Sequence, residues 1–223
     1  MTGGQLSGAF VAFGGHLGPQ EQLPGAWEDC STCPQAQNEL KIGKGFARTA
    51  GGIPAISCPM TKVMFVCTGN ICRSPTAEGV ARKMVSDRGL GQIVEVASSG
   101  MISFHRGEAP DPRTQKAARK RGYDISRQRA RHIDPMDFEE FDLLLALDRS
   151  HLQEMKEMCP REHQHKLHLL MEYGRDGSNR GADVPDPYYG GPQGFDLVVS
   201  MVEEGVRGLL DAIAAGSMAP IRW

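Results

Sequence analysis

The segment that decides the fold runs from Lys62 to Gly89 and reads KVMFVCTGNICRSPTAEGVARKMVSDRG. Its first part, Lys62–Cys67, is a short apolar run of the kind that forms a buried strand. Apolar residues then recur at helical spacing over Pro75–Arg88, and Gly89 follows as a natural helix stop. The segment therefore predicts a strand, a short polar loop and a helix in direct succession.

The same alternation continues along the chain. Further strands are expected at Ile93–Ser98, Leu143–Leu147 and Lys166–Glu172, and further helices at Asp111–Arg121, at His151–Met158 and over an apolar face between Phe195 and Ile213. This pattern predicts the α/β class: a single domain with a four-stranded parallel sheet and helices on both faces. Ligands of such sheets bind beyond the carboxyl ends of the strands, and Cys67 ends the first strand.

Composition and charge describe an ordinary globular protein. The 223 residues are 40% hydrophobic and 23% charged, with a formal net charge of −2, so the chain as a whole attracts neither nucleic acid nor an anionic membrane. No apolar run approaches the ~18 residues of a membrane-spanning helix, and the first residues lack the pattern of a secretion signal. The six cysteines are expected as reduced thiols in a cytoplasmic protein.

Residues 1–59 differ from the rest of the chain. They are rich in Gly, Pro and small residues, show no sustained helical or alternating pattern, and hold three basic residues, Lys41, Lys44 and Arg48. We expect a largely disordered N-terminal extension here, followed by one folded domain over residues 60–223. The alternative is that the natural protein starts at Met60.

The loop after the first strand combines a nucleophile with an anion cradle. The candidate phosphate-binding residues after Cys67 are Thr68, Gly69, Asn70, Ile71, Cys72, Arg73 and Ser74. Their amides can turn inward beside the positive end of the helix dipole, and the arginine fork can hold two phosphate oxygens. Gly69 and Asn70 suit the positive φ angles that such a loop needs. Because the same field favours a thiolate at Cys67, the loop predicts phosphoryl transfer through a cysteinyl-phosphate.

A simpler interpretation of this loop stays open on these residues alone. The spacing C-x5-R also occurs by chance, and Cys67 is then a buried residue of a common strand-to-helix turn. Under both interpretations Ser74 is expected as the N-cap of the helix and Pro75 at its first position.

A second motif, DVPDPYYGG, lies between the last strand and the last helix, at residues 183–191. A phenol has a pKa near ~10, so its departure at neutral pH benefits from a positioned acid. Asp186 is the candidate acid, and Tyr188 and Tyr189 are expected to form an aromatic wall for a substrate ring. Taken alone, the motif is better explained as a turn bounded by Pro and Gly than as part of a catalytic site.

Together, VCTGNICRSP and DPYYG resemble the low-molecular-weight protein tyrosine phosphatase family, over about residues 62–215. The resemblance implies a flavodoxin-like phosphotyrosine phosphatase I fold, no cofactor and no metal. It implies that Cys67 is the nucleophile, that Arg73 binds phosphate, and that Asp186 is the general acid and then the base. The implied substrates are phosphotyrosine-containing proteins, and the implied assembly is a monomer or weak dimer.

The resemblance also implies supporting roles for residues around the loop. Ser74 stabilises the thiolate, and Asn70 holds the loop shape with Ser98 of the SSG segment as its partner. Phe104 stands where the family has an aromatic residue at the rim of the cleft, and Asp148 matches a recurring aspartate that faces the loop. One departure is Gln128, which stands in RQRAR where some members carry a histidine.

Three rival functions remain to be weighed. An arsenate reductase on the same fold needs a later cysteine pair to carry a disulfide outward, but Cys159 is the only later cysteine. A protein-arginine phosphatase tends to carry threonine in place of Ile71. A non-catalytic phosphate-binding protein would be favoured by loss of Cys67, Arg73 or Asp186, all of which are present.

Two cysteine pairs invite other interpretations. A reversible Cys67–Cys72 disulfide would shield the nucleophile from over-oxidation, while the alternative is that Cys72 is a small buried residue. The Cys30-x2-Cys33 pair lacks two further ligands at suitable spacing, so no metal is expected.

The chain also contains a basic stretch with Asp124 as its only acid: Arg113, Lys116, Arg119, Lys120, Arg121, Arg127, Arg129 and Arg131. A solvated surface is the usual meaning of such a stretch, and a docking surface for an acidic phosphoprotein is the alternative. Nucleic acid is not expected as a partner, because no aromatic residues alternate with these charges.

Overall fold

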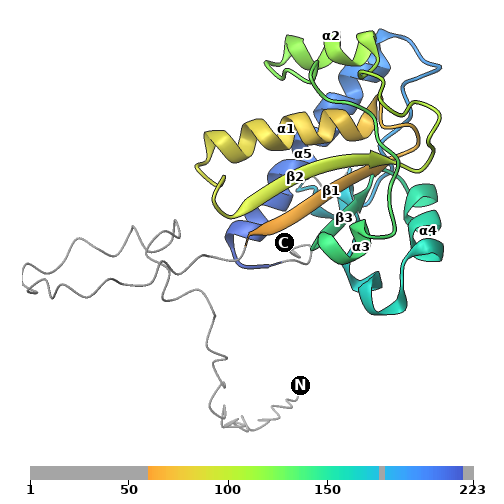
Figure 1. The fold of residues 1–223 in the computed structure, drawn as a ribbon. Helices are drawn as coiled ribbons and strands as arrows, with labels where there is room; N and C mark the ends of the chain where they lie inside the picture. The colour runs from red at the N-terminus through yellow and green to blue at the C-terminus, as the bar shows by residue number, and fades with distance from the viewer. Residues whose placement is uncertain (1–59, 176–178, 218–223) are drawn as a thin grey trace, which may run out of the picture.

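The computed structural model describes residues 60–175 and 179–217, so the expected extension at 1–59, including the Cys30–Cys33 pair, lies outside the described residues. The elements are, in order, β1 (Thr61–Cys67), α1 (Arg73–Asp87), β2 (Val94–Gly100), α2 (Pro112–Lys120), α3 (Asp137–Glu140), β3 (Leu143–Ala146), α4 (Arg149–Met158), the 3₁₀ turn η1 (Arg161–Lys166), β4 (Leu167–Leu169), the 3₁₀ turn η2 (Leu170–Tyr173) and α5 (Pro192–Ala214). Figure 1 shows this arrangement.

A four-stranded parallel sheet forms the centre of the domain, as predicted. Its strand order is β2-β1-β3-β4, and every pair is parallel. β1 lies between β2 and β3, in register from Thr61 opposite Val94 to Cys67 opposite Gly100. The carboxyl end of β1 therefore opens in the middle of the sheet edge, which is where the fold class places a ligand site.

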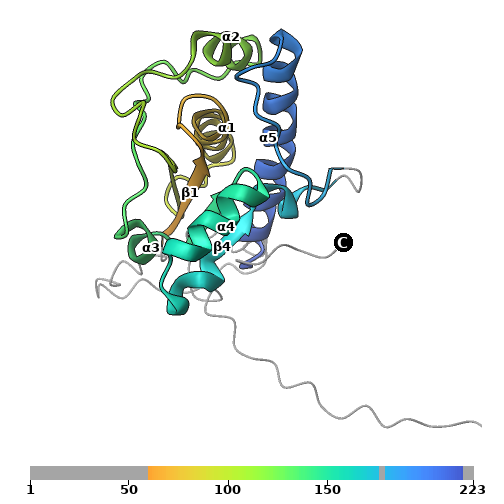
Figure 2. The same ribbon diagram turned by 90° about the vertical axis from the view of Figure 1, so that its right-hand side faces the viewer.

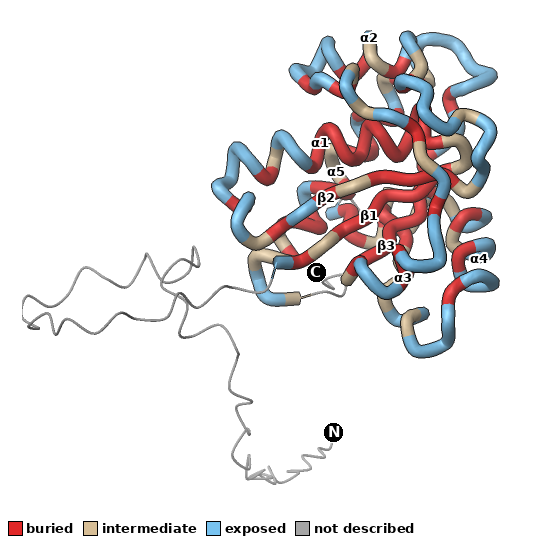
Figure 3. Tube along the Cα trace, in the orientation of Figure 1, coloured by how far each residue is buried: buried red, intermediate tan, exposed pale blue. Residues whose placement is uncertain are grey.

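Helices cover both faces of the sheet, because side chains along β1 alternate between two buried clusters. Val63 and Phe65 pack on one face with residues of α1 and α5, while Met64 and Val66 pack on the other with residues of α3 and α4. Figure 2 shows α4 on the opposite side of the sheet from α1, and Figure 3 shows the strands as the most continuously buried part of the chain. Cys67 belongs to the α1 and α5 side.

The helix stops of the first two helices were also predicted correctly. Gly89 follows α1 with φ 69° and Gly122 follows α2 with φ 83°, a left-handed conformation that favours glycine. Asp111 is the N-cap of α2, because its carboxylate accepts a hydrogen bond from Arg113 N at 2.7 Å. Within the described residues, no helix combines the length and the apolar character needed to cross a membrane.

The predicted fourth strand, Lys166–Glu172, is wrong in length. β4 covers only Leu167–Leu169, and the chain then turns into η2. The pairing with β3 ends at Ala146 opposite Leu169, so residues beyond Leu169 have no strand left to join. Leu170 packs instead against α5. It lies so close to Gly205 that a Cβ added to this glycine would be 2.8 Å from Leu170 Cγ. The short helix α3 was not predicted, since four residues are too few to show a period.

Candidate active site

In the loop between β1 and α1, several carbonyl groups accept hydrogen bonds while the amides of positions 68–72 are free. The carbonyl oxygens of Cys67, Thr68 and Ile71 accept hydrogen bonds from the backbone N–H groups of Met101, Ile102 and Asp111, at 2.8–3.0 Å. Within the described residues, the amides of positions 68–72 donate to no protein acceptor. Neighbouring segments thus hold the loop from outside and leave a run of donors, which is the arrangement of an anion cradle.

Asn70 holds this loop in shape. It is the one non-glycine residue of the described chain with a positive φ, 54°. Its Nδ2 donates to Ser74 Oγ at 2.8 Å and to Ser98 Oγ at 2.9 Å, and its Oδ1 accepts from Arg131 N at 2.9 Å. The Ser98 contact is the one that the resemblance implied. These three bonds offset the cost of the left-handed backbone.

Ser74 supports Cys67 and does not cap the helix. Its Oγ lies 3.0 Å from Cys67 Sγ and 3.1 Å from the carbonyl oxygen of Ser99. The prediction that Ser74 is the N-cap and Pro75 the first helical residue is wrong, because α1 begins at Arg73 and Cys72 occupies the N-cap without a side-chain bond. A serine has a single hydroxyl proton, so Ser74 donates either to the Ser99 carbonyl oxygen or to Cys67 Sγ.

Arg73 is a buried cation held by four acceptors. Its side chain is 4% exposed. Nη1 donates to Asp148 Oδ2 at 2.6 Å and to the carbonyl oxygen of Val184 at 3.2 Å. Nη2 donates to Asp186 Oδ2 at 2.9 Å and to Thr68 Oγ1 at 3.0 Å. A buried charge is tolerated only when paired in this way, and the pairing fixes the guanidinium plane beside the loop.

Asp148 links Arg73 to a histidine that the sequence analysis did not select. As the N-cap of α4, its Oδ1 accepts from His151 N at 2.9 Å and lies 2.8 Å from His151 Nδ1. Burial opposes ionisation of Asp148, but its contacts with His151 and Ser150 outweigh burial and hold its pKa well below the usual range. Asp148 is thus a carboxylate at neutral pH and a fixed counter-charge for Arg73.

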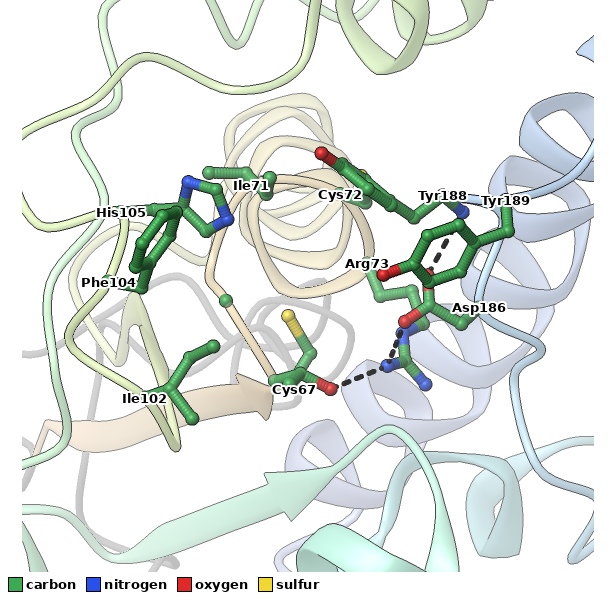
Figure 4. Close-up of a pocket in the computed structure, with 12 residues that line it drawn as sticks. Cys67, Ile71, Cys72, Arg73, Ile102, Phe104, His105, Asp186, Tyr188 and Tyr189 are labelled. Atoms are coloured by element: carbon green, nitrogen blue, oxygen red, sulfur yellow. Dashed lines mark hydrogen bonds and ion pairs between the residues drawn. The ribbon is translucent and has the colours of Figure 1, made fainter.

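Asp186 reaches the same guanidinium from the loop before α5. Its side chain is 44% exposed, and its Oδ1 accepts from Tyr188 N at 3.0 Å. This local bond turns the carboxylate toward Arg73, as Figure 4 shows. The structure therefore brings Cys67, Arg73 and Asp186 to one place although Asp186 follows Arg73 by 113 residues.

A cleft of about 320 Å³ lies above these three residues. Phe104 and Tyr189 stand at its rim, 81% and 95% exposed, and Tyr188 lies beside Tyr189 with ring centroids 4.9 Å apart. Figure 4 shows the cleft with Phe104 on one side and the two tyrosines on the other. Cys67 lies at the base of this cleft and is 2% exposed, so a group must enter between the aromatic walls to reach its sulfur.

Gly69 is needed in this cleft for its size rather than for its backbone angle. The prediction of a positive φ at Gly69 is wrong, since the described left-handed residues do not include it. A Cβ at this position would lie 2.9 Å from His105 Cδ2. Glycine therefore allows the His105 ring to pack directly against the loop.

Comparison with known proteins agrees with this geometry. The family model for the low molecular weight phosphotyrosine protein phosphatase matches residues 62–218. The chain belongs to this family. It is 44% identical over 153 residues to a low molecular weight protein-tyrosine-phosphatase of Streptomyces coelicolor, which covers 68% of this chain and 93% of that protein.

Two further comparisons broaden this result. A low molecular weight phosphotyrosine protein phosphatase of Schizosaccharomyces pombe is 40% identical over 149 residues, covering 65% of this chain and 94% of that protein. A crystal structure of a protein tyrosine phosphatase from Entamoeba histolytica, with Hepes in the active site, superposes with a TM-score of 0.67 at 33% identity. That match covers 70% of this chain and 98% of the other. The protein is therefore a phosphatase of this family, and phosphoproteins are its substrate class.

The sequence analysis did not select three residues of this site: two line the cleft, and one contacts Thr68 from α4. His151 stands three residues after Asp148, which is the spacing between a helix N-cap and the residue whose backbone N–H donates to it, so the sequence DRSH carried a signal for it. His105 and Ile102 line the cleft on the same side as Phe104 (Figure 4). Both stand in an irregular segment after β2, where no periodic pattern indicates which side chains face inward.

Proposed function

We propose that the protein hydrolyses phosphotyrosine in proteins, and aryl phosphates as surrogates, through a cysteinyl-phosphate intermediate. One observation carries the proposal: the free amides of positions 68–72, Cys67 Sγ and Arg73 surround the base of the same cleft that Asp186 borders. Hydrogen-bond donors placed around a nucleophile stabilise the negative charge on the oxygens of the phosphoryl group during its transfer. We propose Thr68 through Ser74 as the phosphate-binding loop.

In the first step Cys67 Sγ forms a bond to phosphorus while the bond between phosphorus and the phenolic oxygen breaks. Arg73 and the loop amides hold the other phosphate oxygens, and Asp186 gives its proton to the departing phenolic oxygen. A phosphate bound by Arg73 competes with Asp186 for Nη2, the nitrogen that now lies 2.9 Å from Asp186 Oδ2. Substrate binding therefore frees the carboxyl group to face the leaving group.

In the second step a water molecule attacks phosphorus and the bond between sulfur and phosphorus breaks. Asp186 takes the proton from this water, which restores the acid and releases inorganic phosphate. The thiolate of Cys67 is then regenerated beside the hydroxyl of Ser74.

The shape of the cleft supports phosphotyrosine as the substrate. The sulfur of Cys67 lies at the base of the cleft, and Phe104, Tyr188 and Tyr189 stand above it. A phenyl ring fills the space between aromatic walls and carries its phosphate to the base. The side chain of phosphoserine is short and has no ring to contact the walls, so we expect it to react poorly.

We further propose a cytoplasmic monomer or weak dimer. The described cysteines Cys67, Cys72 and Cys159 are free thiols, and the mechanism needs a reduced nucleophile, which the cytoplasm maintains. The rim of the cleft carries the exposed rings of Phe104 and Tyr189, which must remain accessible to a protein substrate. We propose residues 60–223 as the catalytic domain and 1–59 as an extension, with no nucleic-acid partner.

A leaving-group series tests the role of Asp186. In Asp186→Asn, turnover of phenyl phosphate should fall by about 10²–10⁴-fold, while p-nitrophenyl phosphate, whose phenolate leaves without help, should lose much less. Asp183→Asn is a matched control, because this aspartate pairs with Arg149 outside the cleft. Equal losses on both substrates would exclude Asp186 as the acid.

A further inference from the structure

A second hollow lies beside the cleft, between α2 and the start of α5. Its volume is about 190 Å³, and the residues that shape it are Arg113, Lys116, Ala117, Lys120, Gly190, Pro192, Phe195 and Asp196. Its floor is partly apolar and its α2 side is basic. Figure 2 shows α2 beside the upper end of α5. None of the catalytic residues proposed above lines this hollow.

The hollow and the catalytic cleft share one wall. Tyr188 and Tyr189 line the cleft, and the next residue, Gly190, lines the hollow. Since an extended chain spans at most ~3.6 Å per residue, Gly190 lies within roughly 7 Å of Tyr188. A peptide whose phosphotyrosine fills the cleft therefore reaches the hollow within a few residues.

Arg113 joins the two sites physically. Its Nη1 donates to the carbonyl oxygen of Tyr188 at 3.0 Å. Its guanidinium carbon lies 5.3 Å from the centre of the Tyr188 ring and 4.8 Å from that of Phe195. These contacts hold the wall in place, and the paired carboxylate of Asp111 at 2.7 Å neutralises much of the charge of Arg113.

The remaining charges leave Lys116 uncompensated. Lys120 pairs with Asp196 at 3.2 Å across the hollow. Lys116 is exposed, and among residues 60–175 and 179–217 no carboxylate forms an ion pair with it. The nine residues of α2 contain four basic residues and no acidic one. The hollow therefore presents a positive potential with one ammonium group free to bind an anion.

We propose that this hollow is a subsite for an acidic residue that lies within a few positions of the phosphotyrosine in the substrate. The carboxylate of a Glu or Asp side chain pairs with Lys116, and its methylene groups contact Phe195 and Pro192. Arg113 keeps the tyrosine wall between the two sites in position. This inference rests on the proposed function and adds a sequence preference to it.

Matched phosphotyrosine peptides test the subsite. One peptide carries Glu at the second to fourth positions on both sides of the phosphotyrosine, and its partner carries Gln at the same positions. In the full-length protein, kcat/KM for the Glu peptide should exceed that for the Gln peptide by roughly two- to fivefold, the range expected for exposed charge pairs. The excess should shrink at high ionic strength.

Two variants of equal charge change locate the effect. Lys116→Glu should lower the Glu-to-Gln ratio to one or below, and Lys156→Glu, on α4 across the sheet, should keep the wild-type ratio. A ratio near one in the wild type, or a ratio that Lys116→Glu leaves unchanged, would overturn the subsite while both peptides are hydrolysed. Failure to hydrolyse either peptide would overturn the proposed function itself.

Discussion

His151 Nε2 lies 2.8 Å from Thr68 Oγ1, and this contact joins α4 to the proposed phosphate-binding loop. The Thr68 oxygen already accepts a hydrogen bond from Arg73 Nη2 at 3.0 Å, so its proton is free to point at His151. The other ring nitrogen, Nδ1, lies 2.8 Å from Asp148 Oδ1. His151 is 3% exposed, and we expect it to position Arg73 through Thr68.

Loss of this contact should weaken phosphate binding. We expect His151→Ala to raise the inhibition constant of inorganic phosphate by roughly tenfold, as for loss of one buried hydrogen bond. Thr68→Val should raise it further, because it also removes the bond from Arg73 Nη2. Because both variants break the contact between His151 and Thr68, the double variant should lose little more than Thr68→Val alone. His165→Ala, on the exposed turn η1, is the control. Strictly additive losses would show that the two residues act independently.

The low pKa of Asp148 predicts a pH-dependent contribution to stability. A carboxylate whose pKa is depressed on folding stabilises the protein above its unfolded pKa, ~3.9, and loses this contribution as pH falls below that value. Asp148→Asn should lower the free energy of unfolding by about 2 kcal/mol at pH 7, since Arg73 keeps Asp186 as a partner. Urea unfolding should show this difference shrinking toward pH 3. A difference that stays constant over this range would refute the assignment.

The close packing of α5 on η2 predicts that one glycine of α5 cannot be replaced by a larger residue without a clash. A Cβ added at Gly208 would overlap the carbonyl oxygen of Tyr173, so the backbone must move. Alanine normally stabilises a helix interior relative to glycine by ~1 kcal/mol. Because of this overpacking, Gly208→Ala should instead lower the free energy of unfolding by about 2–3 kcal/mol. At Gly91 an added Cβ meets nothing within 4 Å, so Gly91→Ala is the control. Thermal melts that rank Gly208→Ala at or above the wild type would contradict this packing.

The buried thiol of Cys72 predicts slow redox protection at neutral pH. Burial raises the pKa of Cys72 to about 12, despite a contact with Thr114 that lowers it. After peroxide converts Cys67 to a sulfenic acid, Cys72 displaces water to form a disulfide, and it must ionise to do so. Peptide mapping should find the Cys67–Cys72 bridge forming faster as pH rises above 7. Rapid bridging that is independent of pH would argue that another thiol or a local opening controls the reaction.

Apart from the short helix α3, the order of the strands and α-helices was readable from the sequence, because each of them shows a local pattern. The run at Lys62–Cys67 and the stops at Gly89 and Gly122 are local signals, and the structure confirms them. The length of the fourth strand was not readable in this way, because it depends on where the partner strand β3 ends.

In the site, too, the residues that belong to local motifs were predictable, and those whose role depends on contacts with distant residues were not. Cys67, Arg73 and Asp186 belong to motifs that are visible along the chain. The position of Ser74 was misjudged, because its hydroxyl is engaged by Cys67, Asn70 and Ser99 rather than by the helix end. His151 was missed, because its contact with Thr68 joins residues 83 positions apart.

The central claim is that Cys67 carries the phosphoryl group during turnover. The most direct measurement is rapid quenching of the protein during hydrolysis of p-nitrophenyl phosphate, followed by peptide mass spectrometry, with Asp186→Ala used to slow hydrolysis of the intermediate. The account predicts one phosphoryl group on Cys67 of the peptide that contains Thr68–Arg73, and none in Cys67→Ser. A phosphoryl group on another residue, or appreciable turnover by Cys67→Ser, would contradict it.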